Sequence, residues 1–382
     1  MKKFIIFSTA LVLLGVQNLF AQLPNGEKTL LHTQTGKVYP KGKLGIYSNT
    51  NFYSKIGDFL GDIKPDNFES INYWLVQGNF VFTYGIMEHF DASVGVRLYQ
   101  DTHAENEFNL PDDIFVTLKT GSFTFARNHF SQAVMASFRI PTGEVHNYPF
   151  TEYTTESVQY GLMYAISYFA DPYLPDRSFN AHFNAGFWNY NEHGTFLYET
   201  FNGEKLNSTV NSSDFRMAMA FAYPTGLFDF RLELTGMVFL QQPNTYVYSA
   251  EEWAFLSPSI RYKPINWIAL DFGVDFRISP DDRNNTSGIP DVSSQVDLPP
   301  NFPDWTVQLG LNIDLNLVGE SATSDLSYEE KKAREKVEMF EAVVSEREKS
   351  ESVQNEIENL KKVRKEAEKE IDELKKILDD DQ

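Results

Sequence analysis

The chain contains no cysteine. This absence excludes disulfide bonds, thiolate metal sites, a cysteine nucleophile and a lipid-anchored N-terminal cysteine. Beyond the N-terminal segment, the chain also lacks any run of about eighteen uninterrupted apolar residues, which is the length that a membrane-spanning helix requires. We therefore do not expect a helical inner-membrane protein, and a stable secreted fold has to come from backbone pairing and packing alone.

Basic residues are scarce. The chain has 33 Lys and Arg against 53 Asp and Glu, a formal net charge of -20, which argues against nucleic acid as a partner. Glycine-rich phosphate loops, zinc-ligand spacings and EF-hand patterns are missing, so we expect no cofactor and no metal ion. His182 is the best single candidate for a catalytic base, but a structural histidine is the favoured interpretation. We predict no catalytic residue and no enzyme.

What the chain does contain is alternation of apolar and polar residues. Between Trp267 and Ile278, every second residue is apolar and the residues between them are small or charged. The stretch from Phe228 to Phe239 repeats this pattern. A period of two is typical of a β-strand with one apolar and one polar face, and a helix cannot produce it.

Twelve such stretches are predicted as strands. They cover residues 42–55, 69–87, 91–102, 111–127, 130–141, 155–170, 177–191, 213–224, 227–241, 251–264, 266–279 and 303–316. The apolar positions change parity near Gly78 and at Gly121-Ser122, which predicts β-bulges at these two places.

The connections between these strands alternate between tight turns and long loops. Tight turns are predicted around 88–90, 128–129, 224–226 and 264–265, with a somewhat longer connection at Asp171–Asp176. The other connections are long and polar, above all 192–212 and 280–302. Twelve amphipathic strands joined in this way predict an all-β fold, a 12-stranded antiparallel up-and-down transmembrane β-barrel, with long loops outside and short turns in the periplasm.

The N-terminus resembles a secretory signal peptide. Lys2 and Lys3 precede an apolar core from Phe4 to Val16, and Leu19-Phe20-Ala21-Gln22 follows. The alternative, a single membrane anchor, is disfavoured because the apolar core is too short to span a bilayer. We therefore assign residues 1–21 to a signal peptide, 22–41 to an N-terminal periplasmic segment and 42–318 to the barrel. The 22–41 segment is short enough to enter the barrel but too small to form a full hatch domain.

The composition changes after about Ser321. No Gly or Pro occurs between Ser327 and Asp381, and Ser327 followed by Glu330 is typical of a helix start. We expect residues 325–382 to form a periplasmic helix. Alternating steps of four and three define a heptad seam that predicts a coiled coil. The seam consists of Val353, Ile357, Leu360, Arg364, Ala367, Ile371, Leu374 and Leu378.

Two interpretations of this helix remain open. The first is self-association, or docking on a periplasmic protein, through the apolar seam. The second is a lone solvated helix that its charge pairs between successive turns stabilise. The unbroken seam favours association, and Arg364 within it weakens a tight apolar core.

The last predicted strand carries a further targeting feature. Gln308–Leu315 resembles the β-signal by which the outer-membrane insertion machinery recognises barrels. Together with the end of the signal peptide, the twelve strands and the loop asymmetry, it makes residues 42–316 similar to Gram-negative outer-membrane β-barrel proteins of the Bacteroidota type. Two short segments, ASFRIPTGE at 136–144 and AYPTG at 222–226, resemble outer-membrane transporters grouped with the MetA pathway of phenol degradation. The helical tail departs from that group.

By the alternation rule, a set of charged residues points into the barrel. They are Arg97, Arg139, Arg216, Arg231, Arg261, Arg277, Asp229, Glu233, Asp271, Asp275 and Asp314, with His182 beside them. These side chains either line a narrow pore, which favours anionic solutes because arginines predominate, or pair with one another and close it.

The leading hypothesis is accordingly a narrow outer-membrane channel or transporter for small, anionic solutes, with a periplasmic helix for oligomerisation or docking. The alternative is a non-conducting structural protein that tethers or organises envelope or secretion components through its coiled coil. Either way the expected partners are outer-membrane lipid, the insertion machinery, and a periplasmic protein or a second copy of the chain.

Overall fold

The computed structural model describes residues 30–57, 71–102, 113–142, 152–199, 203–247, 250–280 and 301–317, and residues 336, 339, 340, 344 and 359–365 near the C-terminus. The predicted signal peptide, residues 22–29 of the predicted periplasmic segment and most of the predicted helix lie outside these residues. The chain divides into two compact units, Met1–Glu320 and Ser321–Gln382.

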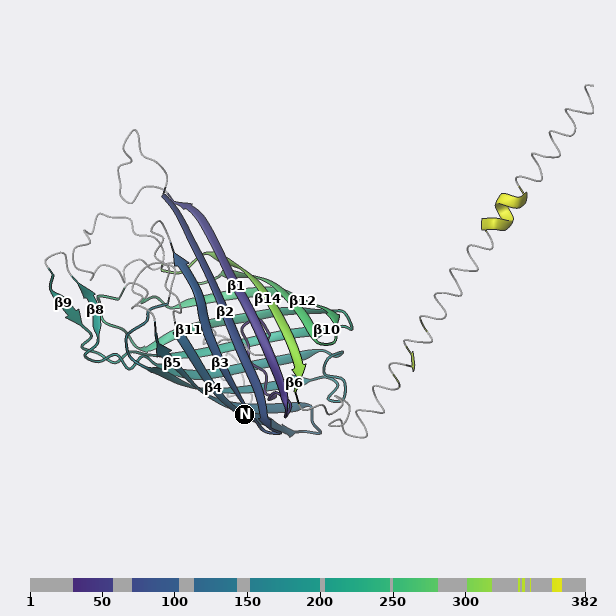
Figure 1. Ribbon diagram of the computed structural model, residues 1–382, viewed down its shortest axis with the longest axis horizontal. Coiled ribbons are helices and arrows are strands. Elements are labelled where there is room, and N and C mark those ends of the chain that lie inside the picture. Colours follow the sequence, from purple (N-terminus) through teal and green to yellow (C-terminus); the bar gives the residue numbers. More distant parts are fainter. Residues whose placement is uncertain are drawn as a thin grey trace, which may run out of the picture. The chain divides into compact units, whose positions relative to one another are not determined.

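The first unit is a closed barrel of twelve strands, each antiparallel to its neighbours (Figure 1). This confirms the predicted fold class. Because β1 pairs with β14 as well as with β2, the sheet has no free edge. The barrel strands are β1 (Lys43–Gly57), β2 (Ile71–Met87), β3 (Phe90–Thr102), β4 (Asp113–Phe125), β5 (Phe130–Pro141), β6 (Gln159–Phe169), β7 (Asn180–Asn189), β10 (Ser213–Pro224), β11 (Phe228–Gln241), β12 (Trp253–Ile265), β13 (Ile268–Arg277) and β14 (Trp305–Asn316).

The predicted strand bounds differ most from the structure at the start of β6, which was expected at 155 and begins at Gln159. Tyr153 stacks on Tyr190, with the ring centroids 5.7 Å apart, and Thr155 contacts the Tyr190 backbone. These residues therefore pack inside the barrel mouth instead of extending the strand.

Both predicted bulges are present. The β2–β3 register shifts between Gly78 and Asn79, and the β4–β5 register shifts between Thr120 and Phe123, where Ser122 has a φ of 61°. A tight turn predicted at 264–265 was placed too early, because Pro264 and Ile265 belong to β12 and the turn lies at Asn266-Trp267. The β12–β13 register is irregular at this point, which accommodates a proline that cannot donate a ladder hydrogen bond.

One predicted loop contains additional structure. Residues 192–212 include a separate two-stranded sheet, β8 (Phe196–Glu199) paired with β9 (Lys205–Asn207). Figure 1 shows this hairpin beyond one end of the barrel wall. The sequence analysis predicted a long polar connection here and did not predict these strands, because strands this short leave no periodic signal.

The two faces of the wall differ in chemistry. Polar and charged side chains at alternate positions are buried inside, whereas large apolar side chains at the positions between them are exposed on the outside. The exposed set includes Phe82, Val94, Leu118, Phe138, Leu162, Phe183, Phe221, Leu232, Ile260, Leu270, Phe272 and Leu309. This arrangement is the reverse of a water-soluble barrel with an apolar core.

Apolar residues also gather inside one end of the barrel. A buried cluster includes Trp188, Met135 and Met163 of the wall, together with Tyr153, Tyr190, Leu197 of β8 and Val247, which come from the connections between barrel strands. The long connections therefore fold back into the mouth of the barrel, at the end opposite the short turns.

In the second unit, residues 336, 339, 340, 344 and 359–365 are helical. Leu360, a predicted seam residue, has an exposed fraction of 64%. Among the described residues, no helix combines the length and apolar character needed to cross a bilayer. The coiled coil itself stays a prediction, because Val353, Ile357, Ala367, Ile371, Leu374 and Leu378 lie outside the described residues.

Candidate functional site

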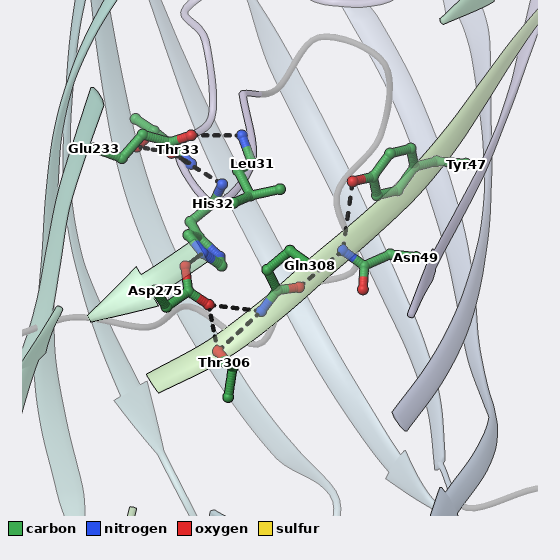
Figure 2. A network of polar contacts seen from close by, with 9 residues as sticks. All are labelled: Leu31, His32, Thr33, Tyr47, Asn49, Glu233, Asp275, Thr306 and Gln308. Carbon is green, nitrogen blue, oxygen red and sulfur yellow. Dashed lines mark hydrogen bonds and ion pairs between the residues drawn. The ribbon is translucent and has the colours of Figure 1, made fainter. Parts of the chain in front are cut away.

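The described part of the segment before β1, residues 30–42, lies inside the barrel. Figure 2 shows its anchor, the carboxylate of Glu233 on β11. Glu233 Oε1 accepts the backbone N–H of Leu31 at 2.6 Å. Its Oε2 accepts the N–H of His32 at 2.9 Å and both the N–H and the hydroxyl of Thr33 at 2.8 Å. A buried carboxylate thus satisfies three successive backbone donors, and these charge-assisted bonds are among the stronger hydrogen bonds in proteins.

A second anchor lies beside the first. His32 Nε2 contacts Asp275 Oδ1 on β13 at 2.7 Å, and Asp275 Oδ2 accepts hydrogen bonds from Thr306 and Gln308 on β14 (Figure 2). Burial by itself lowers the pKa of His32, but Asp275 and, more weakly, Glu233 raise it by more, so that this pKa lies above its usual 6.5. Protonated His32 therefore strengthens the attachment of the segment.

The segment then follows the wall toward the short-turn end. Gln34 exchanges two hydrogen bonds with the Asn184 amide on β7, at 2.7 and 2.8 Å. The Gly36 N–H donates to Ser167 Oγ on β6, and the Gly36 carbonyl accepts from Ser131 Oγ on β5. The next contacts continue around the barrel, with the Tyr39 N–H donating to Asp91 on β3 at 2.6 Å. Among the described residues, eight of the twelve wall strands contribute a polar contact to the segment, namely β2 to β7, β11 and β13.

Two glycines allow this close approach. A Cβ atom on Gly36 would lie 2.1 Å from the Ser131 carbonyl oxygen, and one on Gly85 of β2 would lie 2.0 Å from the Pro40 carbonyl oxygen. Neither position has space for a larger residue unless the segment moves off the wall. The segment and the wall are therefore shaped for each other.

The charged residues predicted to point inward are mostly paired. Arg261 and Arg231 both contact Asp271, at 2.7 and 3.1 Å. Further pairs are Arg216 with Asp214, Arg139 with Asp113, Arg277 with Glu251, Asp229 with Lys263, and Arg231 with Asp229 at 3.8 Å. Of the two interpretations open from the sequence, mutual pairing describes these side chains better than a ring of unpaired arginines does.

The other predicted residues occupy varied environments. Arg97 is buried, with Nε 3.4 Å from Asn79 Oδ1 and its guanidinium 5.7 Å from the centre of the Phe115 ring. His182 Nδ1 lies 2.7 Å from Ser167 Oγ. The same hydroxyl accepts the Gly36 N–H, so His182 helps to position the group that binds the segment. Asp314 is half-buried near the end of β14.

Several contributors were missed by the sequence analysis. His32 and Gln34 lie on a segment without periodicity, and no local signal marks them as wall-binding residues. Asp113, Asp214 and Glu251 lie at strand ends. There the alternation rule does not determine whether a side chain points into the barrel or away from it. Ser131 and Ser167 gave an indirect signal of an internal segment. Both are small hydroxyl side chains at inward positions, where they leave room for a second stretch of backbone inside the barrel.

Comparisons with known proteins place the chain only broadly. No protein-family model matches it, and no curated protein does. Solved structures resemble it at low identity. The NanC porin is 11% identical, with 70% of this chain and 100% of the porin covered and a TM-score of 0.44. An outer-membrane channel from Pseudomonas putida F1 is 7% identical, with 73% and 98% covered and a TM-score of 0.47. The translocator domain of the autotransporter NalP from Neisseria meningitidis is 7% identical, with 72% and 89% covered and a TM-score of 0.38. Likenesses this remote leave the function to be argued from the residues of the chain itself.

The attachment of residues 31–39 is expected to weaken as pH rises. The pKa of His32 is raised in the attached state, so its contribution is complete below the ordinary pKa and is lost as pH rises through the raised pKa. Since the chain has no native cysteine, a spin label on Thr35→Cys reports the attachment through its mobility. We expect the mobility of the label to increase with pH in the otherwise wild-type protein and to be independent of pH in His32→Gln.

His89→Gln, at a turn, is the control and should keep the pH dependence of the label's mobility. A pH dependence that survives in His32→Gln contradicts the assignment to His32.

Proposed function

We propose that the barrel spans the outer membrane of a Gram-negative cell and is a channel for small solutes, with residues 30–39 as a removable internal plug. The observation that carries the location is the exposed apolar outer wall around a polar interior. Phe272, at the middle of β13, has an exposed fraction of 52%, whereas Asp271 next to it is buried. A closed sheet is one of the two folds whose backbone is fully hydrogen-bonded in lipid.

Aromatic residues near the short turns support the same location. The rings of Phe125 and Phe130 stack with centroids 5.1 Å apart, as do those of Phe228 and Tyr262, and Trp267 is exposed in its turn. Rings of this kind gather where hydrocarbon meets the lipid headgroups. They support a membrane interface at the level of the short turns, and short turns lie on the periplasmic side of outer-membrane barrels.

The channel proposal rests on how the plug is held. Its contacts with the wall include individual hydrogen bonds and a histidine–carboxylate pair, centred on Glu233 and Asp275, and a cation–π contact between Lys37 and Phe169. Releasing them separates no pair of barrel strands, so the interior can open while the wall stays closed. A lumen filled permanently by wall side chains would need no such separate segment.

Preference for anionic solutes is the finer part of the proposal. Most inward arginines are paired with carboxylates, so selectivity depends on the charge that remains after pairing. These pairs lie within one strand, as Arg216 with Asp214, or between neighbouring strands, as Arg139 with Asp113. Because they remove unpaired charge from the interior, they favour the alternative, a non-conducting structural barrel.

A periplasmic, self-associating tail is the proposed role of residues 325–382. β14 ends on the side of the short turns, so the tail leaves the barrel on the side assigned to the periplasm. Leu360 of the seam is exposed in the single chain. A side chain that contacts a second helix in an assembly is exposed in this way when the second helix is absent.

Placing a charge on the outer wall tests the location. Phe272→Arg is expected to destabilise the barrel in lipid vesicles by about 2–4 kcal/mol, since arginine is costly at the bilayer midplane. Leu227→Arg, an exposed apolar residue in a short turn, is expected to cost about 0–1 kcal/mol because charge is tolerated near the interface. Reversible urea unfolding from vesicles measures both, and equal costs would argue against a lipid-facing wall.

Weakening the plug tests the channel. In Glu233→Gln one acceptor oxygen becomes a donor that faces the donors of His32 and Thr33, which we expect to weaken attachment by about 2 kcal/mol, or roughly thirtyfold. Planar-bilayer recordings should show a higher open fraction in Glu233→Gln than in the wild type. Glu88→Gln, at an exposed turn position, is the matched control. Silence in every variant, including Gly36→Ala, would favour the structural alternative.

The seam can be tested with two adjacent substitutions. Leu360 belongs to the seam and Val363 does not, yet both are exposed, by 64% and 61%. Analytical ultracentrifugation of the full chain in detergent should show self-association that Leu360→Asp abolishes and Val363→Asp largely preserves, because only a seam position is covered by the partner helix. A monomeric wild-type chain would instead support a lone solvated helix.

A further inference from the structure

A line of wall side chains forms hydrogen bonds with the plug from one end to the other. It begins with the carboxylates of Glu233 and Asp275 (Figure 2). We call the set the backbone track, which consists of Glu233, Asp275, Asn184, Ser167, Ser131, Ser122 and Asp91. From Asn184 onward, its members lie on β7, β6, β5, β4 and β3, which is the order of these strands in the wall. Residues 34–39 therefore cross neighbouring strands one after another.

The backbone track binds main-chain groups along the plug. Its side chains accept N–H groups from Leu31, His32, Thr33, Gln34, Gly36, Val38 and Tyr39. Its donors also bind the carbonyl oxygens of Gln34 and Gly36. Every residue of a polypeptide other than proline offers the same N–H and C=O groups. This part of the recognition can therefore be transferred to a chain of a different sequence.

Side chains of the plug add a sequence preference. Leu31 and Tyr39 are fully buried. A Cβ atom on Gly273 of β13 would lie 2.5 Å from Leu31 Cδ2, and one on Gly45 of β1 would lie 2.7 Å from the Tyr39 hydroxyl oxygen. Each side chain thus occupies space that a wall glycine leaves open, and between them Gly36 lies too close to the wall to carry a Cβ atom. The site fits a peptide with an apolar residue, a glycine and an aromatic residue at these spacings.

Release of the plug removes these hydrogen-bond partners from the backbone track. Glu233 is fully buried while it accepts the N–H groups of the plug. Polar groups that lose their partners in a confined interior are costly, so a solute that supplies N–H donors in the same order is favoured. Ionised carboxylates such as Glu233 and Asp91 only accept hydrogen bonds, and an anionic group offers them no donor. A peptide backbone has the donors that the track requires.

We propose that the backbone track is a binding site for extended oligopeptides, and that residues 30–39 occupy it as an internal competitor. The inference rests on the proposed channel function, because the track becomes free only when the plug leaves, and it assigns peptides as a solute class for the channel. Binding requires release of the plug but no conduction, so the two can be measured separately.

Fluorescence anisotropy tests the site on the full-length protein in detergent. The probe is a peptide with the sequence of residues 30–39, LLHTQTGKVY, labelled at its N-terminus and amidated at its C-terminus. In the wild type the attached plug lowers the apparent affinity, because only molecules with a free track bind the probe. Gly36→Ala in the protein displaces the plug and leaves the track intact, so the affinity for the probe is expected to rise about tenfold.

Thr35→Ala in the protein is the matched control for the plug. The Thr35 hydroxyl contacts the backbone of Lys37 within the plug, so the affinity for the probe should stay at the wild-type value. A second pair of variants tests the wall in the Gly36→Ala protein. Asn184→Ala removes two hydrogen bonds to the backbone and should lower the affinity about tenfold, whereas Gln241→Ala, exposed at the end of β11, should leave it unchanged.

Changes in the probe test the same site without any effect on the folding of the protein. A probe that carries Gly36→Ala should bind the Gly36→Ala protein about tenfold more weakly than the unchanged probe, because the wall has no space for the added methyl group. A probe that carries Thr35→Ala should bind as tightly as the unchanged probe.

The site is overturned by an affinity for the probe that is no higher in the Gly36→Ala protein than in the wild type. Equal binding of the unchanged probe and the Gly36→Ala probe also overturns it. Bilayer recordings on the same proteins separate the two proposals. Peptide binding without current supports the site and contradicts the channel, whereas current in the Gly36→Ala protein without peptide binding supports the channel and overturns the site.

Discussion

The antiparallel pairing of β1 with β14 is the interaction on which the rest of the structure depends. It joins the first strand to the last from Lys43–Asn316 to Phe52–Val307, so that a sheet which would otherwise expose two edges becomes a closed wall. Closure also creates an inside and an outside. Alternate residues of every strand are then committed to two different environments, and the apolar exterior, the polar interior and the enclosed segment all follow from that division.

The interior acts as a recognition surface for a polypeptide backbone. Glu233 accepts three successive N–H groups, Asn184 pairs with both backbone groups of Gln34, and the carbonyl of Gly36 is held by Ser131. These contacts are specific because backbone groups buried without partners would be costly. They are also separable from the fold, since none of them belongs to a strand ladder. Stability of the wall and occupancy of the lumen are therefore controlled by different residues.

The charged side chains within the barrel are also mostly paired. Asp271 pairs with both Arg231 and Arg261 near the plug anchor, while Asp214 pairs with Arg216 and Asp113 with Arg139 near the mouth. Lone buried charges are strongly disfavoured, which explains why these side chains are found in pairs.

The sequence by itself determined the wall. Alternation with a period of two located all twelve barrel strands, and parity changes located the bulges at Gly78 and at Gly121-Ser122, because each residue's face in a strand depends only on its position along the chain. Only the tertiary structure decided what lies within the wall. His32 and Asp275 are separated by 243 positions, and Leu31 and Glu233 by 202, so these contacts depend on how the sheet closes and on where non-periodic segments run. Such segments carry no repeating pattern, and their partners are chosen by shape and charge in three dimensions.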